Sequence, residues 1–259
     1  MRTSSAPAAV CAFAVMAKAP RRGEVKTRLV PPLEADQAAF LSGCFIKDIT
    51  ANFAAVARLL PAQGYVAYSP PGAEAVFRDL VAPGTRLLPP RRVGLGYSLF
   101  HATEDLIAAG YDSACLVNAD SPTLPTSVLV QAAEALRAPG DRMVLGPAID
   151  GGYYLIGLKH PHKLLFEDIS WSTEQVLRQT LDRAASLALD VVTLPTWYDV
   201  DDATSLGWLC AELLAGQRPS QFAPTGYAAA HTTEYLRGLV ARDGGPSLGI
   251  PPFAAGLVQ

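Results

Sequence analysis

The chain has 259 residues and half of them are hydrophobic, so it is long enough to bury the core of one large α/β domain. Its 21 basic and 24 acidic residues give a net charge of −3, which excludes the strongly positive field that binds nucleic acid or an anionic membrane. We therefore expect a globular, cytoplasmic protein with neither nucleic acid nor a membrane as a partner.

The start of the chain contains an apolar stretch, but no convincing cleavage site separates it from Lys18, Arg21 and Arg22. A buried first strand explains this pattern better than a secretory signal. No apolar run approaches the roughly 20 residues that cross a bilayer as a helix. The four cysteines lie far apart, mostly inside apolar runs, which is typical of reduced core thiols.

Short apolar runs alternate along the chain with segments of helical periodicity. The predicted strands cover residues 9–16, 65–69, 86–88, 115–118, 143–145, 153–158 and 191–194. The predicted helices cover 41–60, 98–109, a segment capped by Thr126, a segment with a Ser172–Gln175 capping box, and 204–214. This alternation predicts an α/β protein with an open, mostly parallel sheet flanked by helices, in which ligands bind beyond the carboxyl ends of the strands.

The composition shifts near Gly216, where Pro, Gly, Ala and Ser become frequent. We therefore expect residues 1–215 to form the folded domain. Residues 216–259 are expected to form a tail with one short helix at about 232–241, packed on the domain or on a partner.

A basic segment follows the first predicted strand and puts five cations within eleven residues: Lys18, Arg21, Arg22, Lys26 and Arg28. Lysine supplies a point charge and arginine a bidentate fork for phosphate oxygens, so such a loop can hold a polyphosphate. The spacing of the Walker motif is absent. The alternative is a solvated basic loop.

Asp120 follows a buried predicted strand and precedes Ser121 and Pro122. A carboxylate in that place can bind magnesium or manganese together with substrate phosphates, although aspartate before Ser-Pro is also an ordinary turn former. Asp199, Asp201 and Asp202 follow the last predicted strand. They can supply a second metal ligand or cap the next helix.

Asp150 precedes two glycines, Gly151 and Gly152, between two predicted strands. Paired glycines allow a ligand to approach the backbone closely, and they equally form an ordinary hairpin turn.

Six motifs occur in order over residues 10–212: Lys18-Ala-Pro20, Gly23-Glu-Val-Lys26-Thr-Arg28-Leu29, Asp120-Ser-Pro122-Thr-Leu124, Gly146 to Gly157, Phe166 to Thr173, and Tyr198-Asp-Val-Asp201. With them the chain resembles the bacterial DUF2064 family of nucleotide-diphospho-sugar transferase-like proteins. The resemblance implies a GT-A-like three-layer sandwich over residues 1–215, and it extends to molybdenum-cofactor and phospholactate guanylyltransferases, which share this fold.

The resemblance also implies roles for individual residues, taken motif by motif. The loop that holds the nucleotide phosphates would comprise Lys18, Gly23, Lys26 and Arg28. The divalent metal, magnesium or manganese, would be bound by Asp120 and Asp201. The sugar or acceptor would meet Asp150, Gly151, Gly152 and Trp171, with Asp150 and Lys26 as the catalytic residues.

Three functions from different classes stay open. The first is a metal-dependent glycosyltransferase that moves a sugar from a nucleotide sugar to a small-molecule acceptor. The second is a nucleotidyltransferase that joins a nucleoside triphosphate to a phosphate-bearing small molecule, which the basic loop favours. The third is a non-catalytic nucleotide-binding protein, because Leu95-Gly-Tyr-Ser-Leu99 lacks the Glu-Arg pair that the family usually carries. A homo-oligomer is compatible with each of them.

Overall fold

The structure is a computed structural model, and it describes residues 9–91, 94–219, 222 and 224–243. Residues 1–8, at the start of the chain, lie outside the described part, as do residues 244–259, the last sixteen residues of the predicted tail. The strands are β1 (Cys11–Lys18), β2 (Ala62–Ser69), β3 (Arg86–Leu88), β4 (Ser113–Asn118), β5 (Arg142–Pro147), β6 (Tyr153–Leu158) and β7 (Asp190–Thr193). The helices are α1 (Ala35–Val56), α2 (Glu74–Arg78), α3 (Leu95–Ala108), α4 (Thr126–Arg137), α5 (Val176–Ser186), α6 (Ala203–Ala215) and α7 (Ala230–Asp243), with 3-10 helices η1 (Thr27–Leu29) and η2 (Lys163–Phe166).

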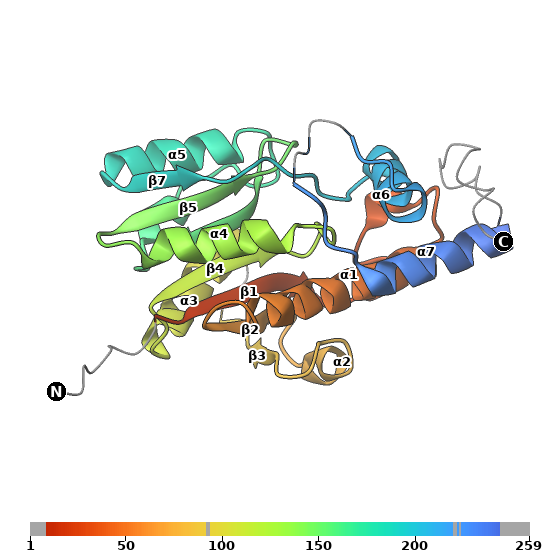
Figure 1. Cartoon of the computed structure of the whole chain (residues 1–259), viewed down its shortest axis with the longest axis horizontal. Coiled ribbons are helices and arrows are strands. Elements are labelled where there is room, and N and C mark those ends of the chain that lie inside the picture. The colour runs from red at the N-terminus through yellow and green to blue at the C-terminus, as the bar shows by residue number, and fades with distance from the viewer. Residues whose placement is uncertain (1–8, 92–93, 220–221, 223, 244–259) are drawn as a thin grey trace.

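The strands form one seven-stranded sheet in the order β3-β2-β1-β4-β6-β5-β7 (Figure 1). β1 pairs in parallel with both β2 and β4, and β2 with β3 and β5 with β7 are also parallel. Only β6 among these strands runs the other way, antiparallel to β4 and to β5. The expectation of an open, mostly parallel sheet is therefore confirmed.

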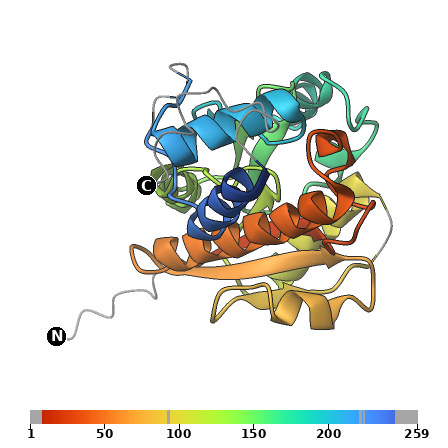
Figure 2. The same cartoon turned by 90° about the vertical axis from the view of Figure 1, so that its right-hand side faces the viewer.

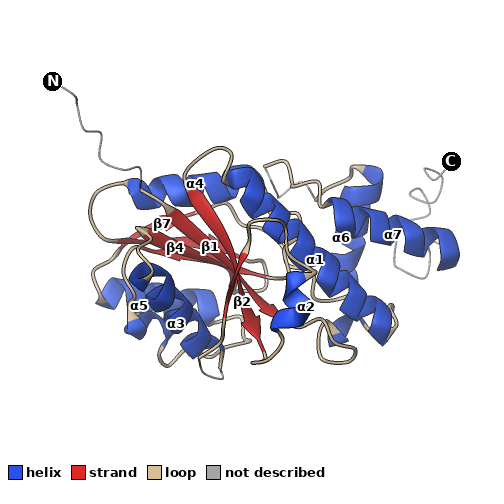
Figure 3. Cartoon of the chain, turned by 90° about the horizontal axis from the view of Figure 1, so that it is seen from below, coloured by secondary structure: helices blue, strands red, loops and turns tan. Residues whose placement is uncertain are grey.

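Helices cover both faces of the sheet and make three layers (Figure 3). Strand β1 shows why, because its residues are buried on both sides: Phe13 and Val15 belong to the core under α1, α4 and α6. The alternate residues, Ala12 and Ala14, belong to the core under α3 and α5. A strand covered on both faces reads as a continuous apolar run, which is the pattern of this segment.

Two predicted helix caps are wrong although the helices themselves form. Pro125, and not Thr126, occupies the N-cap of α4, and the Thr126 hydroxyl instead donates a hydrogen bond to Asn52 Oδ1 at 2.6 Å. Gln175 occupies the N-cap of α5 without a side-chain cap, while Ser172 lies before the helix in a left-handed conformation with φ of 64°. For Thr126, a contact with α1 replaces the local hydrogen bond that the sequence suggests, and for Ser172 the left-handed backbone places the residue outside the helix.

The predicted short helix beyond residue 216 is present as α7, which lies against α1 (Figure 2). Leu236 and Leu239 are fully buried in the core that α1 shares. The buried carboxylate of Asp48 on α1 accepts hydrogen bonds from the backbone N–H groups of His231 at 3.0 Å and Thr232 at 2.8 Å. This carboxylate therefore satisfies the first turn of α7.

Helix α1 has 22 residues and, by length and composition alone, is apolar enough to cross a membrane. The prediction that no segment reaches this length is therefore wrong. Of the most apolar 18-residue stretch of α1, 72% is buried against the sheet and α7. That burial is what a central helix of a protein core shows.

Candidate functional site

The ends of β1 and β4 lie side by side at one edge of the sheet. The two strands pair in parallel with Met16 opposite Asn118, so Lys18 and Asp120 leave the sheet at the same level. The side-chain oxygen of Asn118 accepts a hydrogen bond from the backbone N–H of Asp120 at 3.3 Å. This edge is the carboxyl end of the parallel strands, where ligands of open α/β sheets bind.

The basic loop after β1 folds back over this edge. Leu29 at the end of η1 is fully buried and anchors the loop in the core. Lys26, just before η1, adopts a left-handed backbone conformation with φ of 50°, which is uncommon for a residue with a side chain. This conformation directs the lysine side chain toward the sheet edge and away from solvent.

The Lys26 ammonium lies between two carboxylates. It forms ion pairs with Asp120 Oδ1 and with Asp201 Oδ1, the latter at 3.0 Å, and donates a hydrogen bond to the carbonyl oxygen of Val200 at 2.7 Å. Its side chain is only 5% exposed and also lies over the ring of Phe45. Burial alone would lower the pKa of Lys26, but the carboxylates of Asp120 and Asp201 outweigh it, so the pKa is raised.

The segment after β7 delivers the second carboxylate. Its backbone is held to both sides of the site, because Ile149 N–H donates to the carbonyl of Trp197 and Val200 N–H donates to the carbonyl of Asp120. Asp201 then points to Lys26 and also pairs with Arg28 at 2.6 Å.

The three acids of this segment, Asp199, Asp201 and Asp202, have different surroundings. Asp202 caps α6, where its side chain accepts a hydrogen bond from the backbone N–H of Ser205 at 2.8 Å. Asp199 is buried, and its pKa is raised to about 7 by burial and by the nearby carboxylates of Asp150, Asp201 and Asp120. The sequence marks Asp199 only as one of three acids that can bind a metal or cap a helix, and it assigns the metal role to Asp201 alone. The available signal was its place two residues before Asp201, which puts both side chains on one side of an extended segment.

A pocket of about 340 Å³ opens at this edge, which is within the size range of small-ligand sites. Five residues predicted to bind phosphate or metal line it: Lys18, Lys26, Arg28, Asp120 and Asp201. They come from positions up to 183 residues apart in the chain, and the fold brings them together. We call this pocket the phosphate pocket.

The oxygen atoms around Lys26 are of the kind that a hard divalent cation prefers. They comprise two carboxylates and a backbone carbonyl, and magnesium commonly uses one or two carboxylates together with substrate phosphates. Within the described part of the chain, no group of three or more His, Cys, Asp or Glu side chains is arranged to hold a metal. Two carboxylates and one carbonyl fill only part of the coordination shell of such a cation, so they fit a metal that takes further oxygen ligands from substrate phosphates.

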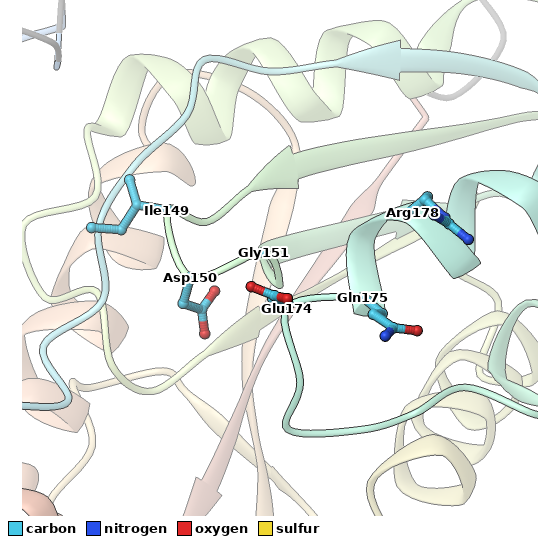
Figure 4. A pocket seen from close by; sticks show the side chains of 6 residues that line it. All are labelled: Ile149, Asp150, Gly151, Glu174, Gln175 and Arg178. Atoms are coloured by element: carbon cyan, nitrogen blue, oxygen red, sulfur yellow. The ribbon is translucent and has the colours of Figure 1, made fainter.

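A second pocket, of about 500 Å³, lies beside the β5–β6 hairpin (Figure 4). One wall is the hairpin loop with Ile149, Asp150 and Gly151, and the other is the segment entering α5 with Glu174, Gln175 and Arg178. We call it the hairpin pocket. Asp199 lies within electrostatic reach of Asp150 in this pocket and of Asp120 and Asp201 in the phosphate pocket, so the two pockets are neighbours.

The two walls of the hairpin pocket are locked together at Gly151. This residue has φ of 86°, and a Cβ atom on it would lie 2.3 Å from the backbone oxygen of Glu174. The N–H of Leu177 donates a hydrogen bond to the carbonyl of Gly151 at 2.9 Å. The glycine is therefore required for close contact between two chain segments.

Three predicted site residues do not line either pocket. Gly23 forms a turn in the basic loop with φ of 74°, and Gly152 donates a backbone hydrogen bond to the Asp150 carboxylate at 2.8 Å. Trp171 packs on the first turn of α3, where a Cβ atom on Gly96 would lie 3.0 Å from the indole nitrogen. The motif of Trp171 and the altered segment 95–99 are therefore in direct contact.

Comparison with known proteins supports this assignment of fold. Residues 52–173 match the model of the family described as "Uncharacterized protein conserved in bacteria (DUF2064)", so the resemblance indicated by the motifs is confirmed. A solved structure from Desulfovibrio desulfuricans G20, described as a candidate nucleotide-diphospho-sugar transferase, is 28% identical to this chain. It covers 89% of this chain and 95% of its own, with a TM-score of 0.74.

Two more distant structures are also similar. CMP:2-keto-3-deoxy-manno-octonic acid synthetase complexed with CTP is 12% identical, covers 80% of this chain and 99% of its own, and has a TM-score of 0.50, which shows the fold alone. Rv0371c from Mycobacterium tuberculosis H37Rv, in complex with manganese, is 16% identical, covers 77% of this chain and 96% of its own, and has a TM-score of 0.46. No curated protein matches the sequence.

Proposed function

We propose that this chain, whose residues 52–173 match the DUF2064 family, is a transferase that binds a nucleotide by its phosphates in the phosphate pocket and transfers a group from it. The observation that carries the proposal is the convergence of Lys18, Lys26 and Arg28 with two carboxylates at the carboxyl end of β1 and β4. Cations for the phosphates and oxygen ligands for a divalent metal then meet in a single pocket.

The reaction that we favour is glycosyl transfer from a nucleotide sugar. The bond between the sugar C1 and the β-phosphate oxygen breaks, a bond from C1 to an acceptor hydroxyl oxygen forms, and the hydroxyl proton passes to a carboxylate. Asp150 faces the hairpin pocket beside the phosphate pocket and is the residue that we assign to this proton. The metal, when bound, neutralises the negative charge of the departing diphosphate.

Nucleotidyl transfer is the second candidate, and the basic loop favours it. In that reaction a phosphate oxygen of the acceptor attacks the α-phosphate of a nucleoside triphosphate and pyrophosphate leaves. Lys26 and Arg28 would then stabilise the charge on the phosphates.

Two measurements test the proposal. Calorimetry with a panel of nucleoside triphosphates and nucleotide sugars, with and without magnesium or manganese, should identify at least one ligand that binds more tightly with metal. Analysis of the products formed from that ligand separates the reactions, because glycosyl transfer releases a nucleoside diphosphate and nucleotidyl transfer releases pyrophosphate. If no nucleotide in the panel binds in either condition, the proposed function is wrong.

A further inference from the structure

All three N–H groups of the Lys26 ammonium are already used inside the protein. They reach Asp120 Oδ1, Asp201 Oδ1 and the carbonyl oxygen of Val200, and the side chain is almost fully buried. A lysine ammonium has three donors and no more. In this arrangement Lys26 therefore has no donor left for a phosphate, although its pocket is the one proposed to hold phosphates.

The three oxygen atoms that hold the ammonium are also the ones that fit a divalent cation. Both cations cannot lie between Asp120 and Asp201 at once, because they would repel each other at contact distance. Arg28 does not block the position, since it pairs with Asp201 Oδ2 from the exposed side of the pocket while Lys26 binds Oδ1.

We infer that Lys26 and a divalent metal occupy the carboxylates of Asp120 and Asp201 alternately, and that the metal, on binding with a nucleotide, transfers the ammonium to the nucleotide phosphates. The inference rests on the proposed function, because it takes the phosphate pocket as a site for metal and nucleotide. It assigns Lys26 a second task, which is to occupy the metal position until a nucleotide arrives.

The consequence is a coupling between the two ligands. A metal that enters alone must displace a buried ammonium and leave it without an anionic partner, which is costly. A metal that enters with a nucleotide provides the displaced ammonium with phosphate oxygens. Metal and nucleotide therefore strengthen each other's binding, and the effect is reciprocal by thermodynamic linkage.

The left-handed backbone of Lys26 supports this task. A residue with a side chain keeps such a conformation only where its surroundings enforce it, and such residues are frequent in sites that change state. Buried Leu29 and the turn of η1 hold the backbone, so that only the lysine side chain has to move between the carboxylates and the phosphates.

The test measures binding of Mn²⁺ alone, without nucleotide, by electron paramagnetic resonance of the free ion. Lys26→Met should bind Mn²⁺ at least about tenfold more tightly than the wild type, because the competing charge is gone from between two carboxylates. The matched control is Lys18→Met, which removes a cation from the same pocket. Lys18 forms no ion pair with a described residue, so its loss should change the affinity by less than about threefold. Equal or weaker Mn²⁺ binding by Lys26→Met, or an equal gain in Lys18→Met, would overturn the inference.

Two further measurements keep the inference testable if Lys26→Met does not fold. Lys26→Gln keeps hydrogen-bond donors near the carboxylates without the charge, and it should show the same gain in Mn²⁺ affinity. In the wild type, the ¹⁵N signal of the buried Lys26 ammonium should stay unchanged with Mg²⁺ alone and shift with Mg²⁺ and inorganic pyrophosphate together. An unshifted signal would contradict the exchange. Because the Mn²⁺ arm uses no nucleotide, its failure is distinct from a failure of nucleotide binding.

Discussion

Asp199 lies in surroundings that are unfavourable for its negative charge. It is buried and lies near the carboxylates of Asp150, Asp201 and Asp120, and its pKa is raised to about 7. The folded protein therefore binds a proton at Asp199 more tightly than the unfolded chain does, and this carboxyl lowers stability as the pH rises from about 4 to 7. A charge kept at such a cost is typical of a functional site.

Asp199→Asn should therefore increase the free energy of unfolding in metal-free buffer. The gain should be near zero at pH 4, grow as the pH rises to about 7, and stay constant above it, at up to a few kcal/mol. Denaturant unfolding from pH 4 to 8 measures it. A gain that is independent of pH would mean that Asp199 is not held in the crowded environment described above.

Gly151 offers a second test at the scale of single residues. Gly151→Ala should cost roughly 1–3 kcal/mol more than Gly140→Ala, because the new methyl group would overlap the backbone of Glu174. Gly140 is the matched control, since it has the same φ of 86° and nothing within 4 Å of an added Cβ atom. Unfolding by denaturant compares the two variants. Equal costs would show that the two walls of the hairpin pocket are not locked together at Gly151.

The sequence predicts which residues meet in the phosphate pocket better than it predicts how they interact. Lys18 and Asp120 follow parallel strands, so their meeting at one edge follows from strand order. The insertion of Lys26 between two carboxylates depends instead on its left-handed backbone, which no local sequence signal requires. The strain is maintained by packing of Leu29, and that packing exists only in the folded protein.

At the scale of elements, the contact between α1 and α7 is the most informative. The composition beyond residue 216 predicts a tail, whereas α7 buries Leu236 and Leu239 on the same core as α1. The helical pattern of this segment was visible in the sequence, but the partner that its apolar face covers was not. The boundary at residue 215 stays a prediction until a shortened chain is measured.

Leu236→Ala should lower the free energy of unfolding by roughly 2–5 kcal/mol, as expected for a buried leucine. Leu59→Ala is the control, because Leu59 is 68% exposed, and its effect should stay within about 0.5 kcal/mol. A chain that ends at residue 215 should show a similar or larger loss, since Asp48 would also lose its partners on α7. If the shortened chain unfolds at the same denaturant concentration as the full chain, residues 216–259 are an independent tail.

For the sheet, too, the sequence predicts the strands but not which strands become neighbours. The apolar runs predict each of the seven strands and the turn between β5 and β6, because buried strands and glycine turns leave local patterns. No local pattern predicts that β6 lies between β4 and β5, because this order depends on which strand edges are free when the chain folds.

At the scale of the whole molecule, the carboxyl end of the sheet collects the functional groups. The phosphate pocket and the hairpin pocket lie next to each other there, and Asp199 is close enough to carboxylates of both to feel their charge. This arrangement suits a reaction in which a nucleotide occupies one pocket and the group that it loses, or the acceptor, occupies the other.

The most direct test of this account is calorimetry of nucleotide binding to wild type and Asp120→Asn, each with Mg²⁺ and with a chelator. The wild type should bind its nucleotide at least about tenfold more tightly with Mg²⁺, as expected for a metal shared between carboxylate and phosphates. Asp120→Asn should stay folded and lose this dependence, while Asp79→Asn, which changes an exposed acid away from both pockets, should keep it. If Asp120→Asn binds nucleotide with the same response to Mg²⁺ as the wild type, the phosphate pocket is not a metal-dependent nucleotide site and the account is wrong.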